Sequence, residues 1–124
     1  MVGHYGCSGV HAALTDRRVG LADNWLRHVK DVHQKHERYL GEKIPTPKRQ
    51  DRLCELNVIE QVVNVCETTI VQDAWARGQD LTVHGWAYRL ETGLVNGLGM
   101  SSRSIEEMTE RYAKSVKRYE SEQN

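Results

Sequence analysis

Only one long stretch of this chain has the composition of a β-strand, and most of its other regular patterns are helical. Residues 81–90 (LTVHGWAYRL) are rich in β-branched and aromatic side chains. After the Thr92-Gly93 turn, Leu94 and Val95 are typical of a short returning strand. One or two strands do not form an independently stable sheet. The sequence therefore predicts an α/β protein that is mostly helical around a small strand core.

Apolar residues recur at helical spacing in several other stretches. They predict helices over residues 10–14, 22–40 and 47–66, a shorter one that starts at Thr68 or Thr69, and a last one over 105–119. Thr46 is the expected N-cap of the third helix, with Pro47 at its first position. Ser104 and Glu107 have the spacing of a capping box at the start of the last helix.

The composition limits what the chain can bind. Its 124 residues are expected to form a single domain, residues 1–124. Lys and Arg number 17 and so do Asp and Glu, which excludes the positive field of a non-specific nucleic-acid binder. The mean hydropathy is −0.64 and no apolar run is long enough to span a membrane. Three cysteines, an odd number, favour a reducing, cytoplasmic setting. We therefore expect neither nucleic-acid nor membrane partners.

The glycine-rich turn at the start of the chain carries the main chemical signal. His4 and Cys7 are three residues apart, and imidazole nitrogen and thiolate sulfur are the ligands that zinc prefers. A pair with this spacing is a weak metal signal by itself, because a catalytic zinc needs three protein ligands and one open position. Cys54 and Cys66 lie on the apolar stripe of a predicted helix, where we expect buried, unreactive thiols.

Other aromatic and imidazole side chains are more simply structural. His28, His33 and His36 are spread around a helix surface, and only His33 and His36 share a face, so solvated or core-edge positions are expected. His84 is also expected to be a structural histidine. The three tryptophans, Trp25, Trp75 and Trp86, are predicted to anchor the core.

Several segments resemble the β-class carbonic anhydrases, most closely their bacterial branch. Residues 3–10 (GHYGCSGV) are similar to the segment that carries the second and third metal ligands of that family. The resemblance continues, in family order and spacing, through residues 21–28 (LADNWLRH), 55–62 (ELNVIEQV), 70–75 (IVQDAW) and 83–88 (VHGWAY). It covers essentially the whole chain.

The resemblance implies a zinc enzyme that interconverts carbon dioxide and bicarbonate. In that family two cysteines and one histidine hold the metal, and hydroxide formed from water attacks carbon dioxide. His4 and Cys7 match two of the three ligands, and no catalytic side chain beyond the metal site is expected. Tyr88 resembles a tyrosine of the bicarbonate effector pocket found in some members. The implied fold is an α/β core with a stub strand leading into His4, parallel to its neighbour.

The chain also departs from the family pattern. The first metal ligand of the family lies in a C-x-D-x-R segment, which this sequence does not contain. The chain therefore resembles the C-terminal portion of the enzyme, and we expect weak zinc binding and carbon dioxide hydration near background. The alternative is a non-catalytic remnant or interaction subunit. We further expect a homo-oligomer, a dimer or tetramer, because the strand over 81–90 would expose an unpaired edge with Val83 and Ala87 on an uncovered face.

Overall fold

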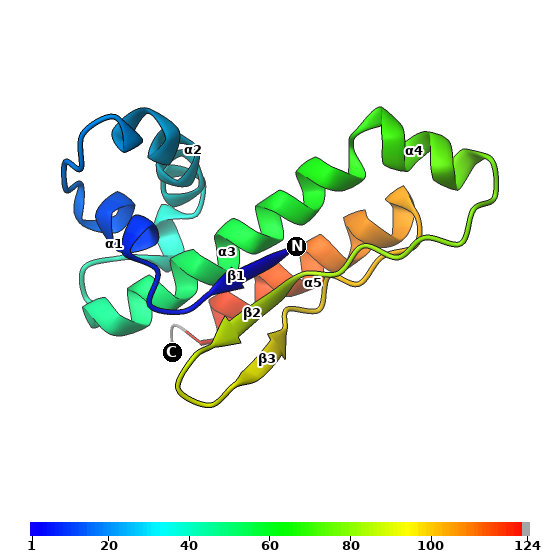
Figure 1. Cartoon of the computed structure of the whole chain (residues 1–124). Coiled ribbons are helices and arrows are strands. Elements are labelled where there is room, and N and C mark those ends of the chain that lie inside the picture. Colours follow the sequence, from blue (N-terminus) through cyan, green and yellow to red (C-terminus); the bar gives the residue numbers. More distant parts are fainter. Residues whose placement is uncertain (123–124) are drawn as a thin grey trace.

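The computed structural model describes residues 1–122, and within them helices surround a small sheet (Figure 1). In chain order the elements are β1 (Val2–His4), α1 (Ser8–Thr15), α2 (Ala22–Lys35), the 3-10 helix η1 (Glu37–Tyr39), α3 (Thr46–Cys66), α4 (Thr69–Ala76), β2 (Trp86–Arg89), β3 (Leu94–Gly97) and α5 (Ile105–Ser121). The α/β class with mostly helical content is confirmed. No helix among these residues is both long and apolar enough to cross a bilayer.

The sheet has the order β1-β2-β3, with β2 in the centre. β1 pairs with β2 in parallel and β2 pairs with β3 antiparallel. The prediction of an open edge along residues 81–90 is therefore wrong, because β2 is paired on both sides and the free edges belong to β1 and β3. Val83 is 8% exposed and Ala87 is fully buried, so the predicted uncovered face is covered. The strand itself is shorter than expected, and Val83 forms only an isolated bridge with Ser102.

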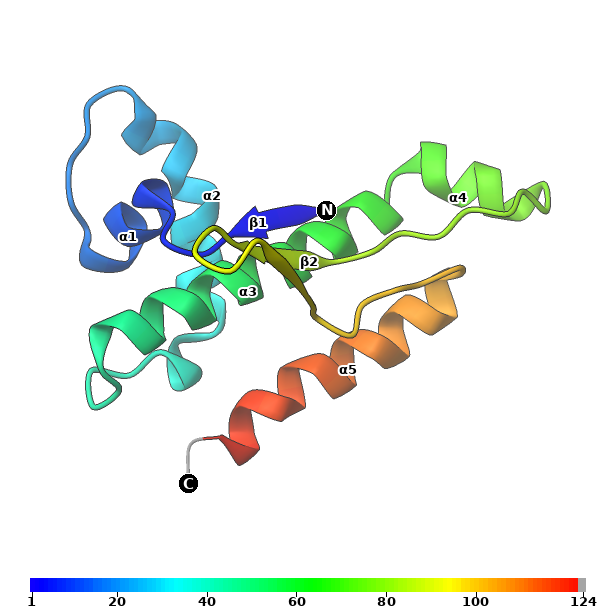
Figure 2. The same cartoon turned by 60° about the horizontal axis from the view of Figure 1, so that its bottom comes forward.

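The long helix α3 is the centre of the molecule. Its predicted apolar stripe is buried, with Leu53, Leu56, Ile59, Val62 and Cys66 each fully enclosed. α1 and α2 pack near its first half, α5 runs along it and α4 continues from its far end (Figure 1). Because β1 and β2 also lie against α3 (Figure 2), this one helix carries both the sheet and the surrounding helices.

Gly3 allows β1 to approach α3 closely. A Cβ atom at this position would lie 2.6 Å from Cγ2 of Val58, a separation that real Cβ atoms do not show. A glycine within a strand often marks such a close approach between backbone and a neighbouring element. The close packing of Gly3 on α3 therefore fixes the position of the following turn relative to that helix.

Hydroxyl side chains cap two helix starts, of which Ser104 supplies one half of the predicted capping box, and the cap predicted for a third helix is off by one residue. The Thr68 hydroxyl accepts from the Val71 amide at 3.3 Å, and the Ser104 hydroxyl accepts from the Glu107 amide at 3.1 Å. At α3 the N-cap is Pro45 rather than Thr46. Pro45 has extended backbone angles, which a residue before the first helical turn needs.

Two of the three tryptophan predictions are wrong. Trp25 is 77% exposed and Trp86 is 40% exposed, whereas Trp75 packs against the core and donates its Nε1–H to the Leu81 carbonyl at 2.8 Å. Trp25 lies on the expected stripe of α2, but within the described residues only Val32 of that helix is buried. The predicted helix over 22–40 also ends early, at Lys35, and its last turn is the separate η1.

Candidate metal centre

His4 and Cys7 lie on one tight turn between β1 and α1. His4 is the last residue of β1 and is exposed, and Cys7 is the half-buried N-cap residue of α1. Gly6 has a φ of +75°, a left-handed conformation that glycine adopts without strain. This turn places an imidazole and a thiol at the carboxyl end of a parallel strand, which is where open α/β sheets carry their sites.

Backbone hydrogen bonds fix this turn. The Tyr5 amide donates to the Tyr88 carbonyl at 2.9 Å, and the Cys7 carbonyl accepts from the His11 amide at 3.0 Å. Nδ1 of His4 lies 3.3 Å from the Tyr5 carbonyl oxygen. If Nδ1 carries the proton and donates it there, Nε2 keeps a lone pair for a metal, an arrangement common among metal-binding histidines. The turn therefore holds its backbone in place, with the His4 side chain exposed and the Cys7 thiol half-buried against the core.

The residues present fit two ligand positions of a zinc site and do not complete one. Imidazole and thiolate are suitable donors for zinc. However, residues 1–122 contain no group of three His, Cys, Asp or Glu side chains placed to hold a single ion. His4 and Cys7 can thus act as a pair of ligands only, and a third would have to come from outside the described residues.

The other two cysteines are buried, as the sequence predicts. Cys54 is 3% exposed and Cys66 is fully buried. The Sγ of Cys54 donates to the His4 carbonyl at 3.3 Å, so this thiol of α3 helps to hold the backbone of the turn. Burial, together with the nearby Glu55 carboxylate, raises the pKa of Cys54 to about 12. Its burial and its hydrogen bond to the His4 carbonyl are those of a structural thiol, as the sequence predicts.

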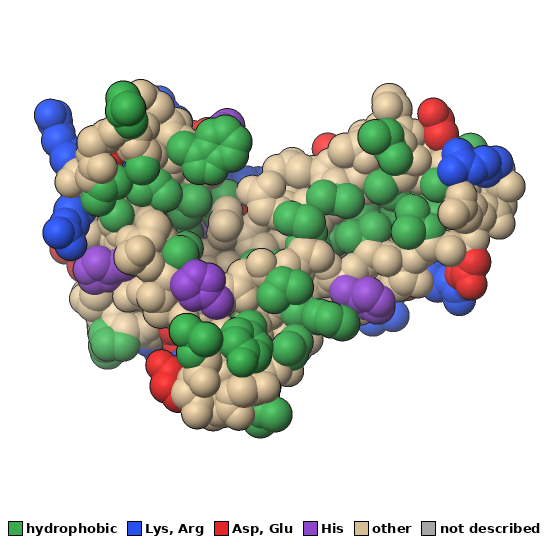
Figure 3. Space-filling model, viewed as in Figure 1, with side chains coloured by type: hydrophobic (Ala, Val, Ile, Leu, Met, Phe, Trp, Pro, Cys, Tyr) green, Lys and Arg blue, Asp and Glu red, His purple; other side chains and the backbone are tan. Residues whose placement is uncertain are grey.

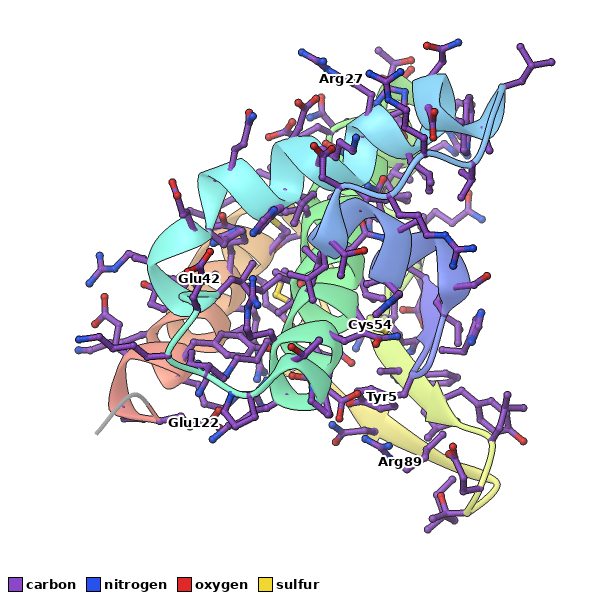
Figure 4. All side chains as sticks on the ribbon, turned by 90° about the vertical axis from the view of Figure 1, so that its left-hand side faces the viewer. Tyr5, Arg27, Glu42, Cys54, Arg89 and Glu122 are labelled. Carbon is purple, nitrogen blue, oxygen red and sulfur yellow. The ribbon has the colours of Figure 1, made fainter. Side chains whose placement is uncertain are left out.

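Tyr5, between the two candidate ligands, points into the protein. It is 6% exposed, and its hydroxyl donates to the Glu55 carboxylate on α3 and accepts from Nδ2 of Asn96 on β3 at 3.0 Å. The Arg89 guanidinium lies 4.1 Å from the centre of its ring, and Figure 4 shows Tyr5 between Cys54 and Arg89. Burial raises the pKa of Tyr5, an effect that the Asn96 bond opposes and Glu55 reinforces.

Sequence reasoning did not identify Tyr5, Glu55 or Asn96 as site residues. The available signal is the position of Tyr5, because a large aromatic residue inside a ligand-bearing turn must either face solvent or reach into the core. Nothing in the helical pattern of α3 distinguishes Glu55 from a solvated glutamate.

The remaining predicted residues lie as follows. Tyr88 is half-buried on β2, directly opposite His4 in the strand register, so the two are cross-strand neighbours. Its role in bicarbonate binding stays a prediction. His36 is buried and donates to Glu60 at 2.7 Å, His33 is half-buried, and the exposed His84 lies 2.7 Å from the Ser101 hydroxyl and stacks on Trp86. His33 and His84 lie at structural positions as expected, whereas His36 is buried and not solvated or at the core edge.

Comparison with known proteins decides the family. The sequence model described as carbonic anhydrase matches residues 1–95. The chain belongs to the carbonic anhydrase family. A curated carbonic anhydrase of Emericella nidulans is 41% identical over 103 residues, a match that covers 83% of this chain and 45% of the relative.

Solved structures agree on the β class. A Coccomyxa β-carbonic anhydrase in complex with acetazolamide matches with a TM-score of 0.78 and 39% identity, over 85% of this chain and 48% of that one. One of two tetrameric β-carbonic anhydrases from Sordaria macrospora matches with a TM-score of 0.73 and 32% identity, over 82% and 51%. The chain spans about half the length of these relatives. β-Carbonic anhydrases are zinc enzymes, and assignment to the bacterial branch stays a prediction.

Proposed function

We propose that this chain supplies His4 and Cys7 as two zinc ligands of a β-carbonic anhydrase site that hydrates carbon dioxide. The observation that carries the proposal is the ligand pair on one fixed turn at the end of β1, in a chain of this family. A bound zinc supplies the Lewis-acid charge that ionises water near neutral pH.

The chain's own contribution is to hold and orient the two donors. The His4 imidazole and the Cys7 thiol bind the metal, and the hydrogen bonds of Tyr5 and Cys54 keep their backbone in place. The third ligand is supplied from outside residues 1–122. Because two ligands leave zinc under-coordinated, the chain alone binds it weakly and turns over carbon dioxide near the uncatalysed rate.

Complementation tests this proposal. Stopped-flow indicator assays would compare the chain alone with the chain fused to the part of the Emericella nidulans enzyme that it does not match. We expect background rates alone and catalysis in the fusion, lost in the His4→Ala and Cys7→Ala fusions. The matched controls His33→Ala and Cys66→Ala remove an imidazole and a thiol elsewhere and should retain activity.

Two outcomes would contradict it. Activity of the chain alone that disappears in His4→Ala would show that the chain completes its own site. An inactive but folded fusion, still inactive with excess zinc, would favour the alternative of a non-catalytic interaction subunit. That alternative is supported by the absence of a third ligand within residues 1–122.

We also propose that the chain acts as an oligomer in a reducing, cytoplasmic setting. Large apolar side chains are exposed on several elements, with Leu21 91%, Ile70 80% and Leu94 68% accessible, and Figure 3 shows apolar side chains across the viewed face. An oligomer would cover part of this apolar surface, and the Sordaria macrospora relatives are tetrameric. A reducing environment would keep Cys7 available as a ligand. Sedimentation at micromolar concentration would test this, and a monodisperse monomer would contradict it.

A further inference from the structure

The C-terminal helix α5 lies outside the part of the chain that the family model matches, yet Glu55 of α3 links it by hydrogen bonds to the metal-ligand turn. The match ends at residue 95, and α5 covers Ile105–Ser121. Near its end, Tyr119 is 1% exposed and its hydroxyl donates to Oε1 of Glu55 at 2.8 Å. The other oxygen of the same carboxylate, Oε2, accepts from the Tyr5 hydroxyl.

Glu55 is thus a bridge between two buried hydroxyls. Each of its oxygens has one tyrosine donor, and the Tyr5 hydroxyl in turn accepts from Asn96 on β3. Hydrogen bonds to a charged carboxylate are about twice as strong as neutral ones. Half-buried chains of this kind restrict every member, since moving one group leaves a buried donor unsatisfied.

We propose that Tyr119, Glu55 and Tyr5 form a positioning chain that sets the geometry of the His4–Cys7 ligand pair. Tyr5 follows His4 directly and precedes Cys7 by two residues, so fixing its ring fixes the backbone that carries both donors. The contacts of Tyr5 come from four elements besides its own turn: Glu55 on α3, Arg89 and the Tyr88 carbonyl on β2, Asn96 on β3 and, through Glu55, Tyr119 on α5.

The inference deepens the proposed function and depends on it. None of the three residues of the positioning chain is expected to touch the metal. Their effect is on the ligand pair, so it should appear in the affinity and the spectrum of a bound ion as well as in catalysis. Groups hydrogen-bonded to the ligand side chains themselves change metal affinity by about 10- to 100-fold when they are removed, and a cluster that acts through the backbone of the turn should lie at the low end of this range.

The experiment is a cobalt(II) titration of the full chain, followed by the absorption of the cobalt–thiolate charge transfer. We expect Tyr5→Phe and Glu55→Gln to weaken cobalt binding about tenfold and Tyr119→Phe somewhat less, each with a shifted charge-transfer band. The matched control is Tyr112→Phe, because Tyr112 is also on α5 and donates to a glutamate of α3, Glu60, at 2.5 Å. This control should lose stability without a change in cobalt affinity or spectrum.

The outcomes separate the inference from the proposed function. If cobalt binding by the unchanged chain is insensitive to both His4→Ala and Cys7→Ala, the ligand pair is wrong and the positioning chain is overturned with it. If binding depends on His4 and Cys7 but the three variants keep the affinity and spectrum of the unchanged chain, the positioning chain alone is overturned. It is also overturned if Tyr112→Phe alters the spectrum as much as Tyr119→Phe. The spectral change would then reflect a general loss of packing by α5 and not the bond between Tyr119 and Glu55.

Discussion

Two glutamates of α3 anchor two different hydrogen-bonded clusters. Glu55 accepts from Tyr119 and from Tyr5 in the ligand turn, whereas Glu60 accepts from Tyr112, His36 and Lys35. Each cluster uses a tyrosine of α5, so the chemistry is similar. The two clusters differ in where their other donors lie. The other donor to Glu55 is Tyr5 in the candidate metal centre, whereas the other donors to Glu60 lie at the end of α2. A tyrosine of α5 bonded to a glutamate of α3 can therefore serve either to position the ligand turn or to join helices.

The Glu60 cluster should carry the larger share of stability. Glu60 is 8% exposed and has three donors, including two that can be charged. Replacing Glu60 with Gln removes the charge and leaves the donors of His36 and Tyr112 poorly paired. We expect a loss of about 3 kcal/mol in the free energy of unfolding, measured by urea denaturation. Cobalt affinity of the folded protein should not change. A variant that loses cobalt binding while keeping its stability would show that the two clusters are not separate.

The same cluster predicts how stability depends on pH. Burial by itself raises the pKa of Glu60, but hydrogen bonds from His36, Tyr112 and Lys35 outweigh it and hold the pKa at about 2. Since the folded value is below the unfolded one of about 4.5, the stabilisation is complete above pH 4.5 and is lost as the pH falls towards 2. The full loss is about 3 kcal/mol.

Denaturation curves between pH 6 and pH 2.5, on the order of one point per half unit, would measure this dependence. Glu60→Gln should show a flatter profile than the unchanged chain. The control Glu110→Gln removes an exposed carboxylate whose pKa is lowered by Lys114, and its profile should follow that of the unchanged chain. Equal slopes for Glu60→Gln and the unchanged chain would contradict the role given to Glu60.

On the metal-centre side, the close approach of β1 to α3 should be sensitive to a single methyl group. Gly3→Ala places a Cβ atom 2.6 Å from Val58 Cγ2, and overpacking of this kind costs about 2 kcal/mol. The control Gly41→Ala adds a methyl group with no atom within 4 Å and should be nearly neutral. Adding Val58→Ala to Gly3→Ala should recover part of the stability in thermal melts. No recovery would mean that the steric contact is not the cause.

The smallest expected effect is the coupling between the two clusters. Tyr112→Phe and Tyr119→Phe should each cost about 1 kcal/mol of unfolding free energy. Because the two hydroxyls have different acceptors, the double variant should equal the sum of the single ones within about 0.5 kcal/mol. A larger coupling in a double-mutant cycle would show that α5 transmits strain from one cluster to the other.

Helical periodicity predicted most of the helices, but it did not predict which of their apolar faces stay exposed. The stripe of α3 from Leu53 to Cys66 is buried as expected, since that helix is packed on several sides. The stripe of α2 is equally regular, yet Trp25 and Leu21 are exposed. A pattern shows which face of a helix is apolar, but it does not show whether another element covers that face. The error about the open strand edge has the same origin, because strand order is a tertiary property.

Of the candidate metal centre, only the proposed ligands can be singled out from the sequence. His4 and Cys7 stand close together in the sequence, so one turn suffices to bring them together. The groups that hold this turn come from positions 55, 89, 96 and 119, and their meeting depends on how α3, the sheet and α5 pack. A glutamate such as Glu55 has the same local pattern whether it faces water or two buried hydroxyls.

The most direct test of the central claim is X-ray absorption at the zinc edge of the zinc-loaded chain. We predict one sulfur ligand per zinc at about 2.3 Å, with nitrogen and oxygen in the other positions and imidazole scattering present. The sulfur should vanish in Cys7→Ala, the imidazole scattering should be lost in His4→Ala, and both should persist in Cys54→Ala. Two sulfur ligands, or a sulfur that persists in Cys7→Ala, would contradict the assignment of His4 and Cys7 as the ligand pair.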